Sequence, residues 1–348
     1  MKVVYTLRHR LHHPQQELES SLFHDPFEHP GRAEGIREVL AADAEFELVA
    51  PDEWGTAPIE AVHDPGLVRF LEVAWEEYQR IHGHRHDVVP DMFAMAALRE
   101  GMGPAAEPRE IGARLGWWCF ETTTPITQGT YDAARASVDV ALTAAAWVLS
   151  GESVAYGLCR PPGHHAARAA YGGYCFFNNA AIVAAHVAAT TGGKVSVLDV
   201  DYHHGNGTQQ IFYERGDVQF VSLPGDPERA YPYITGFRDE TGAGPGSGTT
   251  SNYPLPEDTD DVEYLAALSV ACGEIDAFAP DVVVVSLGLD TYFDDPMCDL
   301  SVTTDGFQDC GAVVRQLGRP TIVLQEGGYA DHALGENVRR WLHGIGTD

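Results

Sequence analysis

VSVLDVDYHHGNG, residues 195–207, places a group of polar side chains directly after an apolar run. The run Val195–Val200 has the length and the β-branched content of a buried strand. Asp199, Asp201 and two histidines lie at its end. Buried carboxylates cost free energy unless they are paired or bind a metal. The stretch therefore predicts a buried strand whose carboxyl end carries a polar site.

Similar apolar runs recur along the chain and predict the rest of a sheet. They are KVVYT from residue 2, SVAYGL from 153, VQFVSL from 218, DVVVVSLGL from 281 and TIVLQEGG from 321. Helical patterns separate them, at residues 131–149, 178–189, 262–278 and 306–317. Runs without polar alternation indicate a sheet covered on both faces, and alternating strands and helices indicate parallel strands with right-handed crossovers. The predicted fold class is α/β, a parallel sheet with helices on both faces.

The chain has 348 residues and no internal repeat, so we expect one domain over residues 1–348. Segment 81–116 differs from the rest because it is rich in Gly, Pro and charge and has no clear period. Long irregular segments in a compact domain are usually functional or mobile. A lid, an oligomer contact and a disordered loop are the alternatives for this insertion.

The composition excludes several classes of protein. The formal net charge is −29, from 51 Asp and Glu against 22 Lys and Arg. Such a surface repels nucleic acid and attracts cationic substrates, although adaptation to salt is the preferred explanation for most of the charge. No apolar run approaches the ~20 residues of a membrane span, and the first residues do not resemble a signal peptide. We expect a cytoplasmic protein without a membrane or nucleic-acid partner.

Six scattered cysteines without C-x-x-C spacing argue against a disulfide scaffold.

Polar residues follow other predicted strands too, at the point where each strand ends. CRPPGHH brings His164 and His165, LGLD brings Asp290, and LQEGGY brings Tyr329. Ligands bind at the carboxyl ends of the strands in parallel sheets. These side chains are therefore predicted to meet Asp201 at one edge of the sheet, which would be the active site.

Asp201 and His203 have the spacing D-x-H, and residues two apart in extended backbone point the same way. Asp290 would complete a set of two carboxylates and one histidine. Three protein ligands leave an open position for water or substrate, as catalytic zinc requires, and oxygen ligands also admit Fe(II) or Mn(II). The D-x-H spacing by itself is weak evidence for a metal site, because many loops contain it. For Asp290 considered in isolation, a helix cap or a turn residue is the preferred interpretation.

The prolines and glycine of RPPGHH predict a rigid turn that holds His164 and His165. A histidine pair beside a metal can supply a general base and acid, and ordinary loop histidines are the alternative. Asp199 and Asn206 are candidates to orient the two rings. The phenol of Tyr329 can donate to a developing oxyanion, with a packed aromatic ring as the alternative.

The histidines of other polar segments are predicted to be solvated surface residues. They are His9, His12, His13, His24, His29, His63, His82, His84 and His86.

Five segments occur together in an order that characterises one family. They are CRPPGHH, YGGYCFFNNAAI, LDVDYHHGNGTQQIF, VVSLGLDTYFDDPM and LQEGGY, between Tyr156 and Tyr329. They resemble the histone deacetylase superfamily, which has the arginase-deacetylase fold. HRLHHPQQEL, FEHPGRAE and HHGNGTQQIFYERGDV are most similar to bacterial acetylpolyamine amidohydrolases and extend the resemblance over nearly the whole chain.

The resemblance implies a role for each candidate. Asp201, His203 and Asp290 resemble zinc ligands, and Tyr329 resembles the tyrosine that polarises the acetyl carbonyl. His165 is similar to the general base, and His164 to its electrostatic partner, with Asp199 as the partner of His164. A structural potassium ion is also implied, with Asp199, Asp201, His203, Ser222 and Leu223 as its ligands. Gly173, Tyr174 and Met297 match residues that line the substrate tunnel, and Glu17 matches an acid near the cationic end of the substrate.

The implied activity is metal-dependent hydrolysis of small acetylated polyamines or diamines to acetate and free amine, with Zn²⁺ or Fe²⁺. The insertion at 81–116 implies a homodimer. Asn206 stands where many histone deacetylases have aspartate, and Glu121 lies near, but shifted from, the acidic gate residues of the polyamine enzymes. A deacylase of acetyl-lysine proteins or of other small N-acyl amines is the nearest alternative. A two-metal ureohydrolase and a non-catalytic acetyl-binding module are further alternatives.

Overall fold

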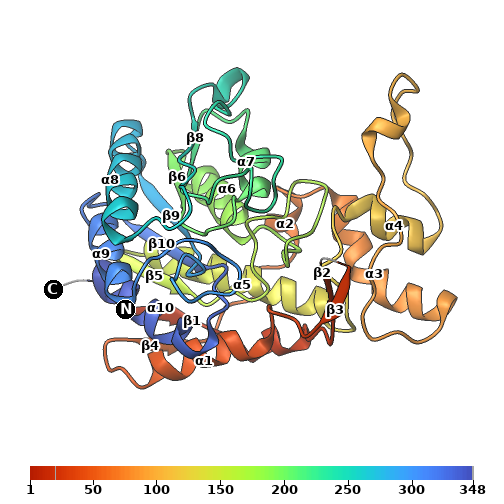
Figure 1. Ribbon diagram of the computed structural model, residues 1–348, viewed down its shortest axis with the longest axis horizontal. Helices are drawn as coiled ribbons and strands as arrows, with labels where there is room; N and C mark the ends of the chain where they lie inside the picture. Colours follow the sequence, from red (N-terminus) through yellow and green to blue (C-terminus); the bar gives the residue numbers. More distant parts are fainter. Residues whose placement is uncertain (20, 347–348) are drawn as a thin grey trace.

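The structure is a computed structural model that describes residues 1–19 and 21–346. Its centre is a parallel sheet of eight strands in the order β4-β1-β5-β10-β9-β6-β7-β8 (Figure 1). The strands are β1 (Lys2–Val4), β4 (Glu47–Val49), β5 (Val154–Gly157), β6 (Val195–Asp199), β7 (Val218–Ser222), β8 (Thr250–Asn252), β9 (Val282–Leu287) and β10 (Thr321–Gln325). All the predicted strands are present. The two edge strands, β4 and β8, were not predicted.

Helices cover both faces of the sheet. One apolar core contains residues of α2 (Ala57–Glu60), α3 (Pro65–His82), α4 (Ile111–Trp118), α5 (Thr130–Leu149), α6 (Asn179–Thr191) and α7 (Asn206–Phe212). The other contains residues of α1 (Pro30–Ala41), α8 (Asp261–Phe278), α9 (Thr304–Arg315) and α10 (Asp331–Ile345). Along β9, Val282 and Val284 face the first core, whereas Val283 and Val285 face the second. Because side chains alternate across a strand, this pattern confirms the predicted α/β sheet with two covered faces.

The sheet order positions the polar residues. β5, β10, β9 and β6 are consecutive in the sheet, although β9 and β10 come much later in the chain than β6. The segments that follow these strands carry His164 and His165, Tyr329, Asp290 and Asp201. The predicted candidates therefore lie at the carboxyl ends of adjacent strands.

Two segments stand apart from the sheet. β2 (Glu17–Glu19) and β3 (Leu22–His24) form an antiparallel hairpin. The insertion between α3 and α4 protrudes from the body (Figure 1), with the short helix η2 (Ala96–Arg99) in it. Two further 3-10 helices are η1 (Leu7–Leu11) and η3 (Gly244–Gly246).

None of the helices in residues 1–19 and 21–346 combines the length and apolarity that a bilayer crossing requires.

The expectation that the remaining histidines are solvated is wrong for His9, His12 and His63, which are buried. Each forms a specific contact inside the molecule. His12 Nδ1 lies 2.9 Å from the Thr130 hydroxyl, and His63 Nε2 accepts the N–H of Asn178 at 2.9 Å. Their burial depends on contacts with distant segments, which local polarity does not reveal.

Candidate active site

Asp201, His203 and Asp290 come together beyond the ends of β6 and β9. Each offers one ligand atom, and these atoms all lie within 4.8 Å of one another. His203 Nδ1 lies 2.8 Å from Asp290 Oδ2 and 3.4 Å from Asp201 Oδ1. Both carboxylates are fully buried, and burial together with the Asp201 charge raises the pKa of Asp290 to about 7. A bound cation would relieve this repulsion, so the oxygen and nitrogen donors fit a divalent metal.

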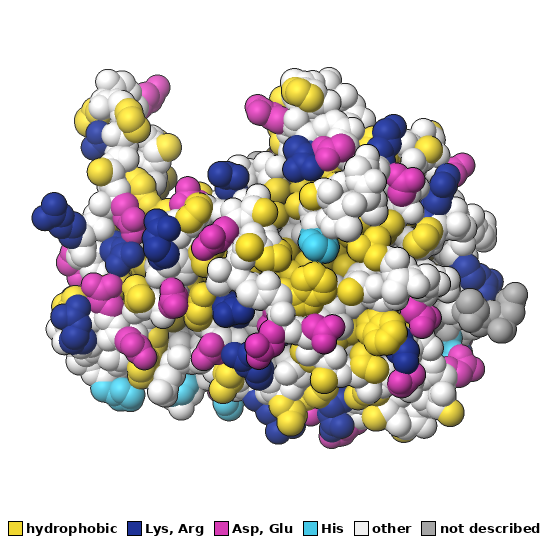
Figure 2. All heavy atoms as spheres, turned by 180° about the vertical axis from the view of Figure 1, so that it is seen from behind, with side chains coloured by type: hydrophobic (Ala, Val, Ile, Leu, Met, Phe, Trp, Pro, Cys, Tyr) yellow, Lys and Arg dark blue, Asp and Glu magenta, His cyan; other side chains and the backbone are white. Residues whose placement is uncertain are grey.

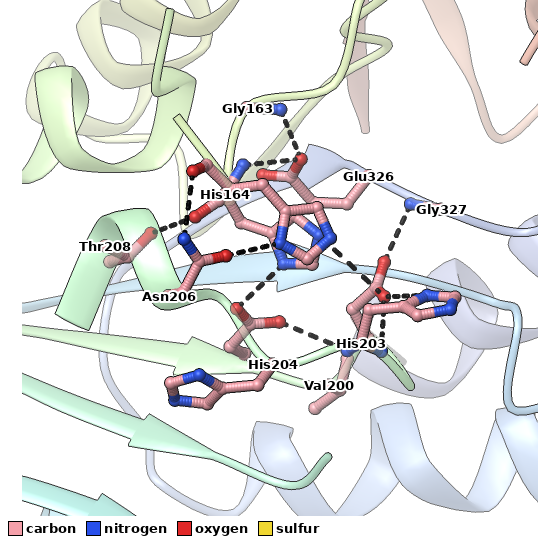
Figure 3. A network of polar contacts seen from close by, with 12 residues as sticks. Gly163, His164, Val200, His203, His204, Asn206, Thr208, Glu326 and Gly327 are labelled. Carbon is pink, nitrogen blue, oxygen red and sulfur yellow. Dashed lines mark hydrogen bonds and ion pairs between the residues drawn. The ribbon is translucent and has the colours of Figure 1, made fainter. Parts of the chain in front are cut away.

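Backbone N–H groups hold the two carboxylates in place. Gly327 donates to Asp201 Oδ2 at 2.8 Å (Figure 3). Tyr202 donates to Asp290 Oδ1 at 2.9 Å. A Cβ on Gly327 would lie 2.6 Å from Asp290 Oδ2 and 2.7 Å from Asp201 Oδ2. Only glycine therefore allows the backbone after β10 to approach both acids.

The adjacent histidines have different hydrogen-bond partners. His164 Nδ1 lies 3.1 Å from Asp199 Oδ2, and His165 Nδ1 lies 2.7 Å from Asn206 Oδ1. The Asn206 amide Nδ2 donates to the backbone carbonyl of His165 at 3.3 Å, which directs its oxygen to the ring. An amide oxygen only accepts, so His165 Nδ1 carries a proton and Nε2 of the neutral ring remains a base.

The surroundings also separate the pKa values of the two rings. Burial disfavours charge on His164, but the Asp201 and Asp199 carboxylates outweigh it and raise the pKa to about 10. Burial and the neighbouring His164 and His203 charges lower the pKa of His165 well below its ordinary value. This arrangement favours an imidazolium at His164 and a neutral ring at His165, a pattern suited to acid–base chemistry.

Tyr329 is fixed beside this group by an arginine. The Arg32 guanidinium lies 4.6 Å from the centre of the Tyr329 ring, and it donates to the carbonyls of Gly328 at 2.6 Å and Glu326 at 3.0 Å. The Tyr174 ring lies edge-on to the Tyr329 ring, with centroids 5.9 Å apart. These contacts hold the phenol near the metal-ligand group.

The sequence reasoning missed two carboxylates that hold the segments carrying His164 and Tyr329. Glu326 Oε2 accepts the N–H of Gly163 at 2.6 Å and of His164 at 3.2 Å (Figure 3). Asp295 Oδ2 accepts the N–H of Tyr329 at 2.6 Å. Burial raises the pKa of Glu326 to about 7 and that of Asp295 to about 6. The sequence did offer a signal for Glu326, because this acid stands directly after the apolar run of the strand in LQEGG.

A cavity of ≈ 400 Å³ opens onto His165, His203 and Tyr329. The expected tunnel residues Gly173, Tyr174 and Met297 are all in its wall.

The predicted acid Glu17 is not in the cavity wall formed by the described residues, whereas Glu19 is. Glu17 is buried, its Oε1 accepts the Tyr174 hydroxyl at 3.1 Å, and burial raises its pKa to about 7. Glu17 therefore contacts the cavity wall through Tyr174.

The residues expected at a potassium ion include Asp201 and His203 of the metal-ligand group and three residues at the ends of β6 and β7. Asp199 and Ser222 are paired between β6 and β7, and the Leu223 N–H donates to the Asp199 carbonyl at 3.0 Å. Ser222 is fully buried, and its hydroxyl has no hydrogen-bond partner in the described part of the chain. An orphaned buried hydroxyl beside a carboxylate fits a cation with oxygen ligands.

Comparison with known proteins agrees with this geometry. The model of the histone deacetylase domain matches residues 26–345. Acetylpolyamine amidohydrolase 2 of Pseudomonas aeruginosa is 42% identical over 345 residues, covering 99% of this chain and 98% of that protein. Acetylpolyamine amidohydrolase of Mycoplana ramosa is 38% identical and covers 99% of both chains. The crystal structure of acetylpolyamine aminohydrolase from Burkholderia pseudomallei superposes with a TM-score of 0.93 at 39% identity, over 100% of this chain and 99% of that one. The chain belongs to the histone deacetylase family.

Proposed function

We propose that this protein is a metal-dependent deacetylase that hydrolyses small acetylated polyamines or diamines to acetate and a free amine. The observation that carries this proposal is one cavity lined by His203 of the metal-ligand group, His165 of the histidine pair and Tyr329. Relatives named acetylpolyamine amidohydrolases, at 38% to 42% identity, support the substrate class. Glu19 in the cavity wall and Glu17 behind Tyr174 support a cationic substrate.

Asp201, His203 and Asp290 would hold the divalent metal, for which we propose Zn²⁺, with Fe²⁺ as the alternative. When bound, such an ion polarises an acetyl carbonyl and lowers the pKa of water. We propose Asp199, Asp201, His203, Ser222 and Leu223 as the ligands of a structural potassium ion, supported by the orphaned Ser222 hydroxyl.

The remaining side chains move protons and stabilise charge. His165 accepts a proton at Nε2 from the attacking water, because Asn206 holds its Nδ1–H. The Tyr329 hydroxyl donates to the acetyl oxygen as that oxygen becomes negative. An imidazolium of the pair returns a proton to the departing nitrogen, so that water and amide yield acetate and amine.

We propose that residues 1–348 act as one domain and form a homodimer through the insertion. Met92, Met95, Leu98 and Met102 of the insertion are each more than half exposed. Figure 2 shows apolar side chains on this protruding segment, at the upper left. Exposed apolar clusters of this kind mark interaction surfaces.

We also propose a cytoplasmic location, which is supported by the free thiols of all six cysteines within the described residues.

A comparison of substrates tests the proposed function. The purified protein, supplied with Zn²⁺ or Fe²⁺, is expected to release acetate from acetylputrescine and other acetylated polyamines with higher kcat/KM than from acetyl-lysine peptides. The reverse preference would support the protein or N-acyl deacylase alternative. Failure to hydrolyse any acetylated amine would contradict the proposal.

A further inference from the structure

The turn at Gly173 and Tyr174 touches both catalytic rings. A Cβ on Gly173 would lie 2.3 Å from Cδ2 of His165, so the backbone packs directly on that ring. Tyr174 packs edge-on against Tyr329. Gly173 and Tyr174 have φ values of 58° and 65°, in the left-handed region. This conformation is unfavourable for a tyrosine, so surrounding contacts must hold the turn.

Glu121 and Thr124 supply those contacts. Glu121 Oε1 accepts the N–H of Gly173 at 3.0 Å and also the hydroxyl of Thr124. The Thr124 Oγ1 in turn accepts the N–H of Tyr174 at 2.7 Å. Glu121 Oε2 accepts the backbone N–H of Thr123 and its hydroxyl, the latter at 2.6 Å. One carboxylate thus binds both amides of the turn, one directly and one through a threonine.

We propose that Glu121 is a positioning residue for deacetylation, which holds the Gly173–Tyr174 turn against His165 and Tyr329. This inference rests on the proposed function of the cavity. A small displacement of catalytic groups costs large factors in rate, so loss of the clamp acts on kcat.

A cation-binding role is the competing explanation for Glu121. Both of its carboxylate oxygens already accept hydrogen bonds from the protein. Among the described residues Glu121 is not part of the cavity wall, whereas Glu19 is. The contacts therefore favour positioning over substrate binding.

Four variants test the clamp. E121Q keeps the shape of the side chain but replaces one acceptor oxygen with a donor. T124V removes the hydroxyl that links Glu121 to Tyr174, and T124S restores a hydroxyl. T122V is the matched control, because the Thr122 hydroxyl in the same loop donates to the Leu18 carbonyl at 3.0 Å and not to the turn.

Two measurements distinguish the explanations. Hydrogen exchange by mass spectrometry on a peptide containing residues 171–175 reports the turn without any substrate. Steady-state kinetics on acetylputrescine and on a neutral acetamide of similar length reports its effect on the reaction. E121Q and T124V are expected to speed exchange and to lower kcat about tenfold or more on both substrates, with KM changed less than about threefold. T124S and T122V are expected to resemble the wild type.

Other results would overturn the inference. Unchanged exchange in E121Q and T124V would show that the clamp does not hold the turn. A rise in KM for acetylputrescine alone, with kcat unchanged, would make Glu121 a substrate-binding residue. If the wild type hydrolysed neither substrate, the proposed function would fail, and the exchange measurement would still decide whether the clamp exists.

Discussion

Nδ1 of His165 lies 2.7 Å from Oδ1 of Asn206, an amide rather than a carboxylate. An amide orients the ring but does not stabilise a positive charge on it as a carboxylate does. The neighbouring His164 faces the carboxylate of Asp199 instead. The two histidines therefore differ in their readiness to hold a proton because their partners differ in charge.

The variant N206D is expected to raise the pKa of His165 by about 1 unit, because a carboxylate stabilises the imidazolium. A general base works only when it is deprotonated, so activity falls as pH decreases through this pKa. The acidic limb of the kcat/KM profile should consequently move to higher pH by the same amount. The matched variant N206A should lower kcat without this shift. An acidic limb that stays in place in N206D would contradict the assignment of His165 as the base.

Removal of the metal is expected to abolish activity, and Zn(II) or Fe(II) should restore it. Asp201, His203 and Asp290 form one group of ligand atoms within 4.8 Å, so metal analysis should give one divalent ion per chain. Because the ion binds only the folded protein, chelation should also lower Tm. The variant D290N should lose both metal and activity. Two essential divalent ions per chain would instead indicate ureohydrolase chemistry.

The variant Y329F is expected to lower kcat about 100-fold or more, because it removes the hydroxyl that donates to the developing oxyanion. The ring and its contact with Arg32 remain, so Tm and metal content should stay at wild-type values. These two quantities separate a lost hydrogen bond from a damaged fold. A variant that retained the full rate would remove Tyr329 from the mechanism.

Glu17 is expected to make the preference for cationic substrates depend on pH. Burial raises its pKa to about 7, so the carboxyl is neutral below this pH and negative above it. The ratio of kcat/KM for acetylputrescine to that for a neutral acetamide should rise roughly 3- to 10-fold as pH increases through 7. Taking the ratio cancels the titrations that both substrates share. The variant E17Q should give a flat ratio, and a wild-type ratio that is also flat would exclude Glu17 from substrate selection.

The pattern of apolar and polar residues was sufficient to predict the α/β class, the inner strands and the strand ends at which polar residues gather. Continuous apolar runs such as Val195–Val200 identify buried strands because both faces of a parallel sheet are covered. Asp201 and Asp290 stand just beyond such runs, which predicted that both lie at the carboxyl ends of the strands, on the same edge of the sheet. The structure brings these residues together, and the experiments above test the roles assigned to them.

Tertiary structure alone decided which segments became neighbours. β9 and β10 insert between β5 and β6, so Asp290 and Tyr329 meet residues that precede them by many positions in the chain. The edge strands β4 and β8 have three residues each and form through pairing with a neighbour, so local propensity does not identify them. The roles of Glu326 and Glu121 depend on backbone N–H groups from distant segments. Such contacts have no local pattern because long-range packing, and not the neighbouring residues, sets their geometry.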